Sequence, residues 1–207
     1  MKLLIFFLIA YLCGSIPFGY IVGKIRGVDL KKTGYKRVGA SNVYKSVGFI
    51  PAVFVFFADF IKGIIPILIG KWIGLPEVTA SMGGIFAIIG HNWPVWLRFK
   101  GEGRGVATSC GLVFFLLPRE TVFLIIIFVV LTLTLKSSPL PFFIFFLLMP
   151  VMAMKFKEPV WLIWMAVSIF GLFVFKRVIG NVKLLKDRKT ALNLILFDTI
   201  KRVNEKS

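Results

Sequence analysis

Residues 47–69 read VGFIPAVFVFFADFIKGIIPILI, an apolar run interrupted only by the charged side chains of Asp59 and Lys62. About 20 consecutive apolar residues, each rising 1.5 Å along a helix, cross the roughly 30 Å hydrocarbon layer of a membrane. The apolar residues follow one another instead of alternating, which is typical of a membrane helix and excludes a strand of a membrane β-barrel. This stretch therefore predicts a helix that spans a lipid bilayer.

The whole chain has the same character. Of its 207 residues, 58% are hydrophobic and 17% are charged, and the mean hydropathy is +0.90. A soluble domain carries about 25% charged residues, so this composition excludes an ordinary soluble enzyme, a disordered chain and a collagen-like repeat. We predict an all-α fold, a polytopic membrane protein of about seven transmembrane helices.

The predicted spans are apolar stretches between clusters of charge. They cover residues 3–22, 47–69, 80–97, 106–117, 122–135, 140–154 and 160–175. Several are shorter than the roughly 20 residues of a full crossing, so we expect neighbouring helices to complete the depth. Together they make one predicted membrane domain, 1–175, with cytoplasmic loops at 23–46 and 98–105 and a basic cytoplasmic tail at 176–207.

The basic residues fix an expected orientation and a class of partner. The chain holds 26 Lys and Arg against 9 Asp and Glu, a net charge of +17, and 20 of the 26 fall on one side of the predicted topology. The positive-inside rule puts that side in the cytoplasm, with the N-terminus outside and the C-terminus inside. The excess favours anionic membrane lipid or a phosphorylated ligand. Nucleic acid is not expected as a partner, because no solvated basic domain is large enough.

Polar residues concentrate in two of the predicted cytoplasmic loops. Residues 31–45 read KKTGYKRVGASNVYK, and residues 99–109 read FKGEGRGVATS just before a predicted helix. Alternating glycines and cations at a helix start can turn backbone N–H groups toward an anion, with the positive helix end behind them. A phosphate-sized ligand is the natural prediction, although the spacing is not that of a Walker A loop. The alternative is a basic turn that serves only the membrane topology.

Resemblance to a known family adds to this interpretation. Gly14-Ser15-Ile16-Pro17-Phe18-Gly19, Gly39-Ala40-Ser41-Asn42-Val43, Asp59-Phe60-Ile61-Lys62-Gly63 and the stretch from Gly90-His91 to Thr108 occur in this order. Their order resembles the bacterial acyl-phosphate-dependent glycerol-3-phosphate acyltransferases, the PlsY family. The resemblance implies seven spans in the bacterial inner membrane and transfer of an acyl group from acyl phosphate to the 1-hydroxyl of glycerol 3-phosphate, giving lysophosphatidate for phospholipid synthesis. A soluble enzyme that supplies acyl phosphate is left open as a partner.

The chemistry needs phosphate binding more than a nucleophile. Acyl phosphate is a mixed anhydride with a good leaving group, so aligning the two substrates and neutralising their phosphates would suffice. No metal or cofactor is expected, because one histidine and two cysteines in apolar runs make no metal cluster. The expected substrate-binding residues are Gly39, Asn42, Lys45, Lys100, Gly103, Arg104, Gly105 and Thr108.

Four further side chains have candidate roles. His91 and Asn181 are the candidate catalytic residues, and each has an alternative: His91 as a helix cap or partner of a loop carbonyl, Asn181 as a helix cap. Asp59 and Lys62 lie three residues apart on one helical face, which predicts a partly buried structural ion pair.

The chain also departs from the family pattern. Tyr35-Lys36-Arg37 replaces a usual Ser-Gly-Asn, and Glu102 is an additional residue in the third loop. Lys45 stands where the family usually has an arginine, and Arg104 stands where it has a lysine. Val178 occupies the position of a usual histidine. Two alternative functions therefore stay open: a degenerate paralogue that binds a phospholipid or phosphometabolite without turnover, and a small anion transporter. The second would place ionisable groups near the membrane midplane, where the spans offer only Asp59 and Lys62.

Overall fold

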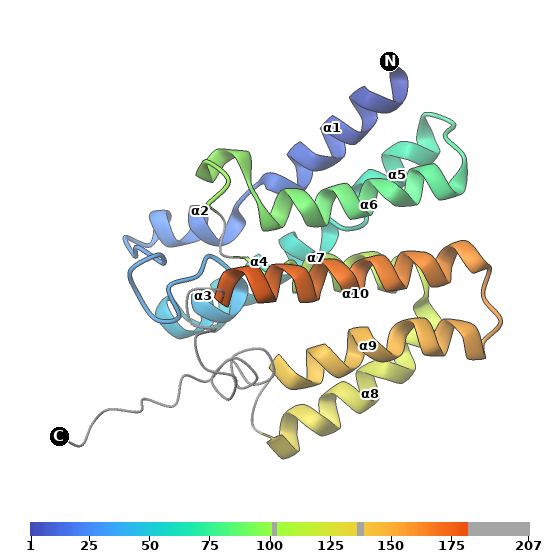
Figure 1. The fold of residues 1–207 in the computed structure, drawn as a ribbon. Coiled ribbons are helices and arrows are strands. Elements are labelled where there is room, and N and C mark those ends of the chain that lie inside the picture. Colours follow the sequence, from blue (N-terminus) through green and yellow to red (C-terminus); the bar gives the residue numbers. More distant parts are fainter. Residues whose placement is uncertain (101–102, 136–138, 182–207) are drawn as a thin grey trace. The chain divides into compact units, whose positions relative to one another are not determined.

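Helices make up the regular structure of the chain. The computed structural model describes residues 1–100, 103–135 and 139–181, and it contains no strand in those ranges. The helices form two compact units, Met1–Leu116 and the part from Leu117 onward (Figure 1). Four segments are long and apolar enough to cross a membrane: Lys2–Ile25, Phe49–Trp72, Pro118–Leu135 and Val160–Ile179. The expected all-α, polytopic class is confirmed.

The first unit begins with a helix that breaks. Helix α1 (Lys2–Ser15) ends before Ile16, whose backbone is extended, and α2 (Phe18–Ile25) begins after Pro17. Proline has no N–H to donate and pushes the residue before it out of the helical region, so the break follows from the sequence. The predicted single span 3–22 is therefore two helices.

The second predicted span is also divided. Helix α4 (Phe49–Ile61) stops at a turn that contains Lys62 and Gly63, and α5 (Ile65–Trp72) starts with Pro66 in its first turn. Proline is well tolerated there because the first N–H groups of a helix have no partner within it. The turn places Lys62 inside the unit instead of along a continuous helix.

The remaining helices of the first unit frame the predicted loops. Helix α3 (Ala40–Ser46) lies within the expected first loop, so that loop is partly helical, contrary to expectation. Helix α6 (Glu77–Asn92) is followed by a short 3₁₀ turn, η1 (Val95–Leu97), and α7 (Val106–Leu116) follows the third loop.

Close helix contacts hold the first unit together. Helix α6 packs along α1 and α5, and α7 packs along α4 (Figure 1). A Cβ added at Gly14 would clash with the backbone of Ala87, and one at Gly111 would clash with the backbone of Phe60. In lipid the hydrophobic effect does not drive helices together, so van der Waals packing contributes much of the association energy. Small residues increase that packing because they let two helix backbones approach closely.

The second unit is a set of three longer helices. Helix α9 (Pro139–Lys155) packs against both α8 (Pro118–Leu135) and α10 (Val160–Asn181), and it continues through Pro150 without a break. The predicted last span ended at 175, but the helix runs on to Asn181, so the first residues of the predicted tail are helical. The rest of that tail lies outside the described residues.

Candidate functional site

The break between α1 and α2 releases carbonyl groups that a continuous helix would have used. The ammonium of Lys62, from the turn after α4, meets two of them: Nζ lies 3.0 Å from the oxygen of Gly14 and 2.8 Å from that of Ile16. An unpaired backbone carbonyl is costly in lipid. Lys62 therefore stabilises the break and fixes where α1 ends.

Lys62 is itself neutralised by a carboxylate. Its Nζ lies 2.8 Å from Oδ1 of Asp59, one helical turn earlier, and the two side chains are 3% and 4% exposed. Nζ also lies 5.4 Å from the ring centre of Phe18, a cation–π distance. A buried ion pair is tolerated when further hydrogen bonds satisfy its protons, which the two carbonyls do here.

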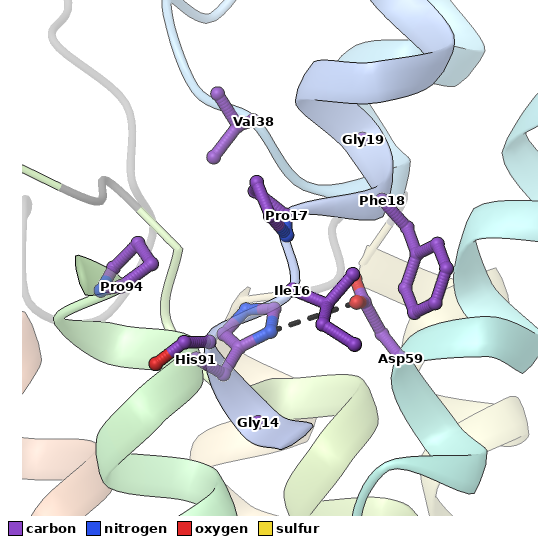
Figure 2. A pocket seen from close by; sticks show the side chains of 10 residues that line it. Gly14, Ile16, Pro17, Phe18, Gly19, Val38, Asp59, His91 and Pro94 are labelled. Atoms are coloured by element: carbon purple, nitrogen blue, oxygen red, sulfur yellow. Dashed lines mark ion pairs between the residues drawn. The ribbon is translucent and has the colours of Figure 1, made fainter. Parts of the chain in front are cut away.

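His91, near the end of α6, completes the group. Its Nδ1 lies 3.3 Å from Nζ of Lys62 and 3.6 Å from Oδ1 of Asp59, and its side chain is 12% exposed. Figure 2 shows the imidazole pointing toward the carboxylate across the stretch between α1 and α2. The broken helix, α4 and α6 thus meet at one polar cluster, Asp59–Lys62–His91, inside an apolar unit.

A pocket opens beside this cluster. Asp59 and His91 line it together with the α1–α2 break, and its lining also includes Val38 from the first loop and Pro94, between α6 and η1 (Figure 2). The first predicted loop therefore borders the pocket, whereas the third approaches it through Gly103, which lies against the ring of His91. It is the place in the first unit where charged side chains, freed carbonyls and loop backbone come together.

Asn42 organises the first loop. Its side chain is fully buried, with Nδ2 donating to the carbonyls of Leu30 (3.0 Å), Thr33 (3.0 Å) and Arg37 (2.7 Å). Its Oδ1 accepts from the backbone N–H of Tyr35 at 2.7 Å. We predicted Asn42 as a substrate-binding residue; these contacts instead engage its amide in holding the loop in shape, which favours a positioning role.

The other predicted residues of the first loop are more open. Gly39 precedes the first turn of α3, and Lys45 is an exposed residue of its last turn. The Lys45 ammonium lies 4.5 Å from the ring centre of Tyr35, a cation–π contact between two of the positions that depart from the family pattern. The exposed ammonium stays available to an anion at this edge of the unit.

In the third loop, glycines pack against α6. A Cβ added at Gly103 would lie 2.6 Å from Nε2 of His91, and one at Gly105 would lie 2.9 Å from Oδ1 of Asn92. Gly105 also has a φ of +67°, in the left-handed region that suits glycine. The loop backbone can approach His91 so closely because it carries no side chains at these positions.

The remaining predicted residues are placed as follows. Thr108 is fully buried in α7, and its hydroxyl has no hydrogen-bond partner among the described residues. Arg104 is half-buried and engaged in a contact, and Lys100 is exposed. Asn181 is the last residue of α10, in the other unit, and its side chain lies outside the described part, as does Glu102.

Sequence reasoning missed two parts of the site. The carbonyls of Gly14 and Ile16 were not foreseen as partners of Lys62, although Pro17 in an apolar run was a signal that a helix could break there. The contact between Lys62 and His91 was also missed, because nothing in the local sequence relates residues 29 positions apart.

The fold and the site define a class: an all-helical integral membrane protein with a buried ionic cluster beside glycine-rich, cationic loops. Comparison with known proteins gives the family. A model described as glycerol-3-phosphate acyltransferase matches residues 4–188, and the chain belongs to this family. Crystal structures of the integral membrane glycerol 3-phosphate acyltransferase PlsY, in glycerol 3-phosphate and lysophosphatidic acid forms, are similar, with TM-scores of 0.79 and 0.78. They are 34% and 32% identical and cover 89% and 93% of this chain, and 92% and 99% of theirs.

Curated relatives agree. The glycerol-3-phosphate acyltransferase of Geotalea daltonii is 36% identical over 81% of this chain and 86% of its own length. That of Aquifex aeolicus is 44% identical over 59% of this chain, and the match spans 64% of the Aquifex protein, just under two thirds. These relatives favour the acyltransferase interpretation over the degenerate-paralogue and transporter alternatives.

Proposed function

We propose that this protein transfers an acyl group from acyl phosphate to the 1-hydroxyl of glycerol 3-phosphate and so makes lysophosphatidate for phospholipid synthesis. The main observation in support is the similarity of this chain, over most of its length, to the glycerol 3-phosphate and lysophosphatidic acid forms of PlsY, at 34% and 32% identity. The polar cluster, the pocket beside it and the two cationic loops of the first unit support it, because they supply cations and amides that two phosphorylated substrates need.

The reaction balances without a covalent enzyme intermediate. The 1-hydroxyl oxygen bonds to the acyl carbonyl carbon, the bond from that carbon to the phosphate oxygen breaks, and the hydroxyl proton ends on the released phosphate. The protein then has to align two substrates and stabilise negative charge, which preorganised amides and cations do. In this proposal Gly39, Gly103 and Gly105 offer backbone amides, Arg104, Lys45 and Lys100 offer charge, and Thr108 offers a side-chain hydrogen bond. Asn181, in the other unit, stays a candidate by the family resemblance alone.

The acyl chain fits the membrane setting of the protein. At a site at the end of apolar helices, only the reactive carbonyl end of the fatty acyl group has to leave the lipid. The rest of the acyl chain stays among apolar groups, which avoids the free-energy cost of exposing it to water. This explains why a soluble fold would suit the reaction less well. A soluble enzyme that makes acyl phosphate would then deliver its product at the same membrane face.

We further propose a bacterial inner-membrane location with the N-terminus outside and the tail and both polar loops in the cytoplasm. The bias of 20 of 26 basic residues supports it. A test replaces Cys13 and Cys110 with serine and introduces Lys36→Cys, Lys100→Cys or Lys157→Cys singly. In intact cells an impermeant thiol reagent should label only the last variant; labelling of Lys36→Cys but not Lys100→Cys would contradict a shared loop face.

The activity test uses the full chain in lipid vesicles with acyl phosphate and labelled glycerol 3-phosphate. We expect labelled lysophosphatidate from the wild type and at least a tenfold loss in Arg104→Ala, because one charge-assisted phosphate contact contributes about 1.5–3 kcal/mol. Lys155→Ala is the matched control, an exposed cation at the end of α9. No product from correctly folded wild type would overturn the proposal, and ligand-dependent thermal stabilisation without product would favour binding without turnover.

A further inference from the structure

The ammonium of Lys45 lies against the ring of Tyr35. Its Nζ is 4.5 Å from the ring centre, and the other cation–π contacts in the described part of the chain are longer, at 5.4–5.8 Å. Both side chains are at the surface: Tyr35 is 55% exposed, and Lys45 is also an exposed residue. The face of an aromatic ring attracts a cation but carries no net charge. The contact therefore orients the ammonium without neutralising it.

Other lysines of the first unit lie close to carboxylates. Nζ of Lys62 is 2.8 Å from Oδ1 of Asp59. Nζ of Lys32 is 3.8 Å from Oδ2 of Asp29. Among the residues that the structure describes, no carboxylate lies within ion-pair distance of Lys45. Lys45 thus keeps its full positive charge for a ligand, and the N–H groups of its ammonium that do not face the ring remain available as donors.

The segment that carries the ring is held against α3. The backbone N–H of Tyr35 donates to Oδ1 of Asn42 at 2.7 Å, and Asn42 is fully buried in α3. Gly34, just before Tyr35, has a φ of +62°, in the left-handed region that glycine adopts without strain. Asn42 and Lys45 are three residues apart, so they share one face of the helix. The backbone and the ring of Tyr35 therefore contact the same face of α3, and the backbone contact is anchored by a buried amide.

An ammonium that is held in place before a ligand arrives binds the ligand more tightly. A lysine side chain has many rotamers, and a ligand that binds a freely moving lysine has to restrict them. The ring of Tyr35 already restricts the rotamers of Lys45, in the last turn of α3. Removing the ring should therefore weaken binding of an anion to Lys45 while leaving the charge of Lys45 unchanged.

We propose that Tyr35 is a positioning residue for Lys45: its ring holds the ammonium in the last turn of α3, where the ammonium contacts a substrate phosphate. Tyr35 acts through Lys45 and needs no contact with the substrate. The inference rests on the proposed function for the identity of the phosphate, that of glycerol 3-phosphate or of acyl phosphate. The contact between the ring and the ammonium is a property of the free protein.

NMR of the lysine side chains tests this contact directly. In the full chain labelled with ¹³C-lysine, in lipid, the signal that is absent from Lys45→Met is that of Lys45. An aromatic ring shifts protons above its face upfield. We expect the ε-methylene protons of Lys45 to be shifted upfield in the wild type and in Tyr35→Phe, but not in Tyr35→Leu. A Lys45 signal that is the same in the wild type and in Tyr35→Leu would overturn the proposal without reference to activity.

Titrations followed on the same signal show whether the contact serves a phosphate. Glycerol 3-phosphate or acyl phosphate should shift the Lys45 signal, and glycerol should not. We expect the dissociation constant to be about two- to tenfold higher in Tyr35→Leu than in the wild type, the effect of losing one exposed cation–π contact and freeing one side chain. Equal dissociation constants would contradict the role of Tyr35.

Steady-state kinetics separate positioning from catalysis. We expect Tyr35→Leu to raise KM for one phosphorylated substrate by about two- to tenfold with kcat unchanged, and that substrate is the one whose phosphate Lys45 contacts. Tyr35→Phe retains the ring and should keep KM within about twofold of the wild type. In Lys45→Met, adding Tyr35→Leu should have no further effect. Additive effects, or a rise in Tyr35→Phe as large as that in Tyr35→Leu, would show that Tyr35 does not act through its ring on Lys45.

Tyr44→Leu is the matched control. Tyr44 is another tyrosine of α3, 62% exposed, but its ring meets the ring of Phe49 edge-on at 6.4 Å instead of a cation. Its replacement should leave both KM values as in the wild type, and a rise equal to that of Tyr35→Leu would contradict the proposal. Wild type that makes no lysophosphatidate but shows the upfield, phosphate-sensitive Lys45 signal would refute the proposed function and leave the positioning of Lys45 standing.

Discussion

Two prolines within apolar helices have opposite effects in this protein. Pro17 separates α1 from α2, whereas Pro150 lies inside α9 and the helix continues through it. Both remove a backbone donor. The difference is that Lys62 bonds the carbonyls of Gly14 and Ile16 at the first break. A proline permits a break in a membrane helix, and a polar partner from another helix makes the break stable.

The largest expected effect comes from removing that partner. Lys62→Met removes the nearest cation from the buried carboxylate of Asp59 and the ammonium donor from the carbonyls of Gly14 and Ile16, so we expect the free energy of unfolding to fall by about 3–5 kcal/mol. Lys71→Met is the matched control: Lys71 also pairs with a carboxylate, Glu77, but the two side chains are 43% and 61% exposed. That change should cost less than about 1 kcal/mol. Thermal unfolding in detergent compares them, and equal losses would show that burial is not what matters.

The second effect concerns the first loop. In Asn42→Asp an acceptor-only carboxylate replaces the amide that donates to three carbonyls, so we expect a loss of about 2–3 kcal/mol and a higher KM for glycerol 3-phosphate. Ser46→Ala is the control, because its hydroxyl makes only a long 3.4 Å contact with Asn42. Proteolysis of the loop and steady-state kinetics report the two changes. A loop that stays protected in Asn42→Asp would refute the positioning role.

The third effect contrasts two helical glycines. Gly14→Ala places a methyl group against the backbone of Ala87, which should cost about 1–3 kcal/mol through overpacking. Gly171→Ala, in α10, meets no described heavy atom within 4 Å, so it should be neutral or stabilising by up to about 1 kcal/mol through helix propensity. Unfolding midpoints of the two variants measure the difference. Tolerance of Gly14→Ala would mean that α1 and α6 are free to separate.

The smallest effect is expected from an ion pair in the second unit. Arg119, at the start of α8, pairs with Glu158 just before α10, and the arginine side chain is 62% exposed. Water screens such a pair, so Arg119→Gln should change stability by less than about 1 kcal/mol and leave acyl transfer intact. Salt titration of the unfolding midpoint provides the check. A loss as large as that of Lys62→Met would remove the contrast between buried and exposed pairs.

Hydropathy alone predicted most of the architecture. The apolar runs gave the all-α class and the approximate positions of α7 to α10, because in lipid a continuous apolar stretch has few other structures available. The divisions at Pro17 and at Lys62 were not predicted. Whether a proline breaks a helix depends on partners 46–48 residues away in the chain, and hydropathy carries no information about such contacts.

The sequence indicated which residues belong to the candidate site better than it indicated how their side chains are arranged. Of the two glycine-rich loops, the first contributes Val38 to the pocket beside the polar cluster, and the third lies against His91 through Gly103. Asn42, however, was expected at the substrate and is instead buried under its own loop. An asparagine flanked by glycines and cations has the same local pattern in both cases, and only the tertiary fold decides whether its amide faces a ligand or its own backbone.

The chain order of the polar cluster has a consequence for synthesis. The carbonyls of Gly14 and Ile16 leave the ribosome first, the carboxylate and ammonium of Asp59 and Lys62 follow within one turn of each other, and His91 comes last. A charged group entering the bilayer alone is expensive. Here Asp59 waits only one turn for Lys62, and Lys62 and His91 each emerge after the groups that they contact, so the cluster can assemble without the second half of the protein.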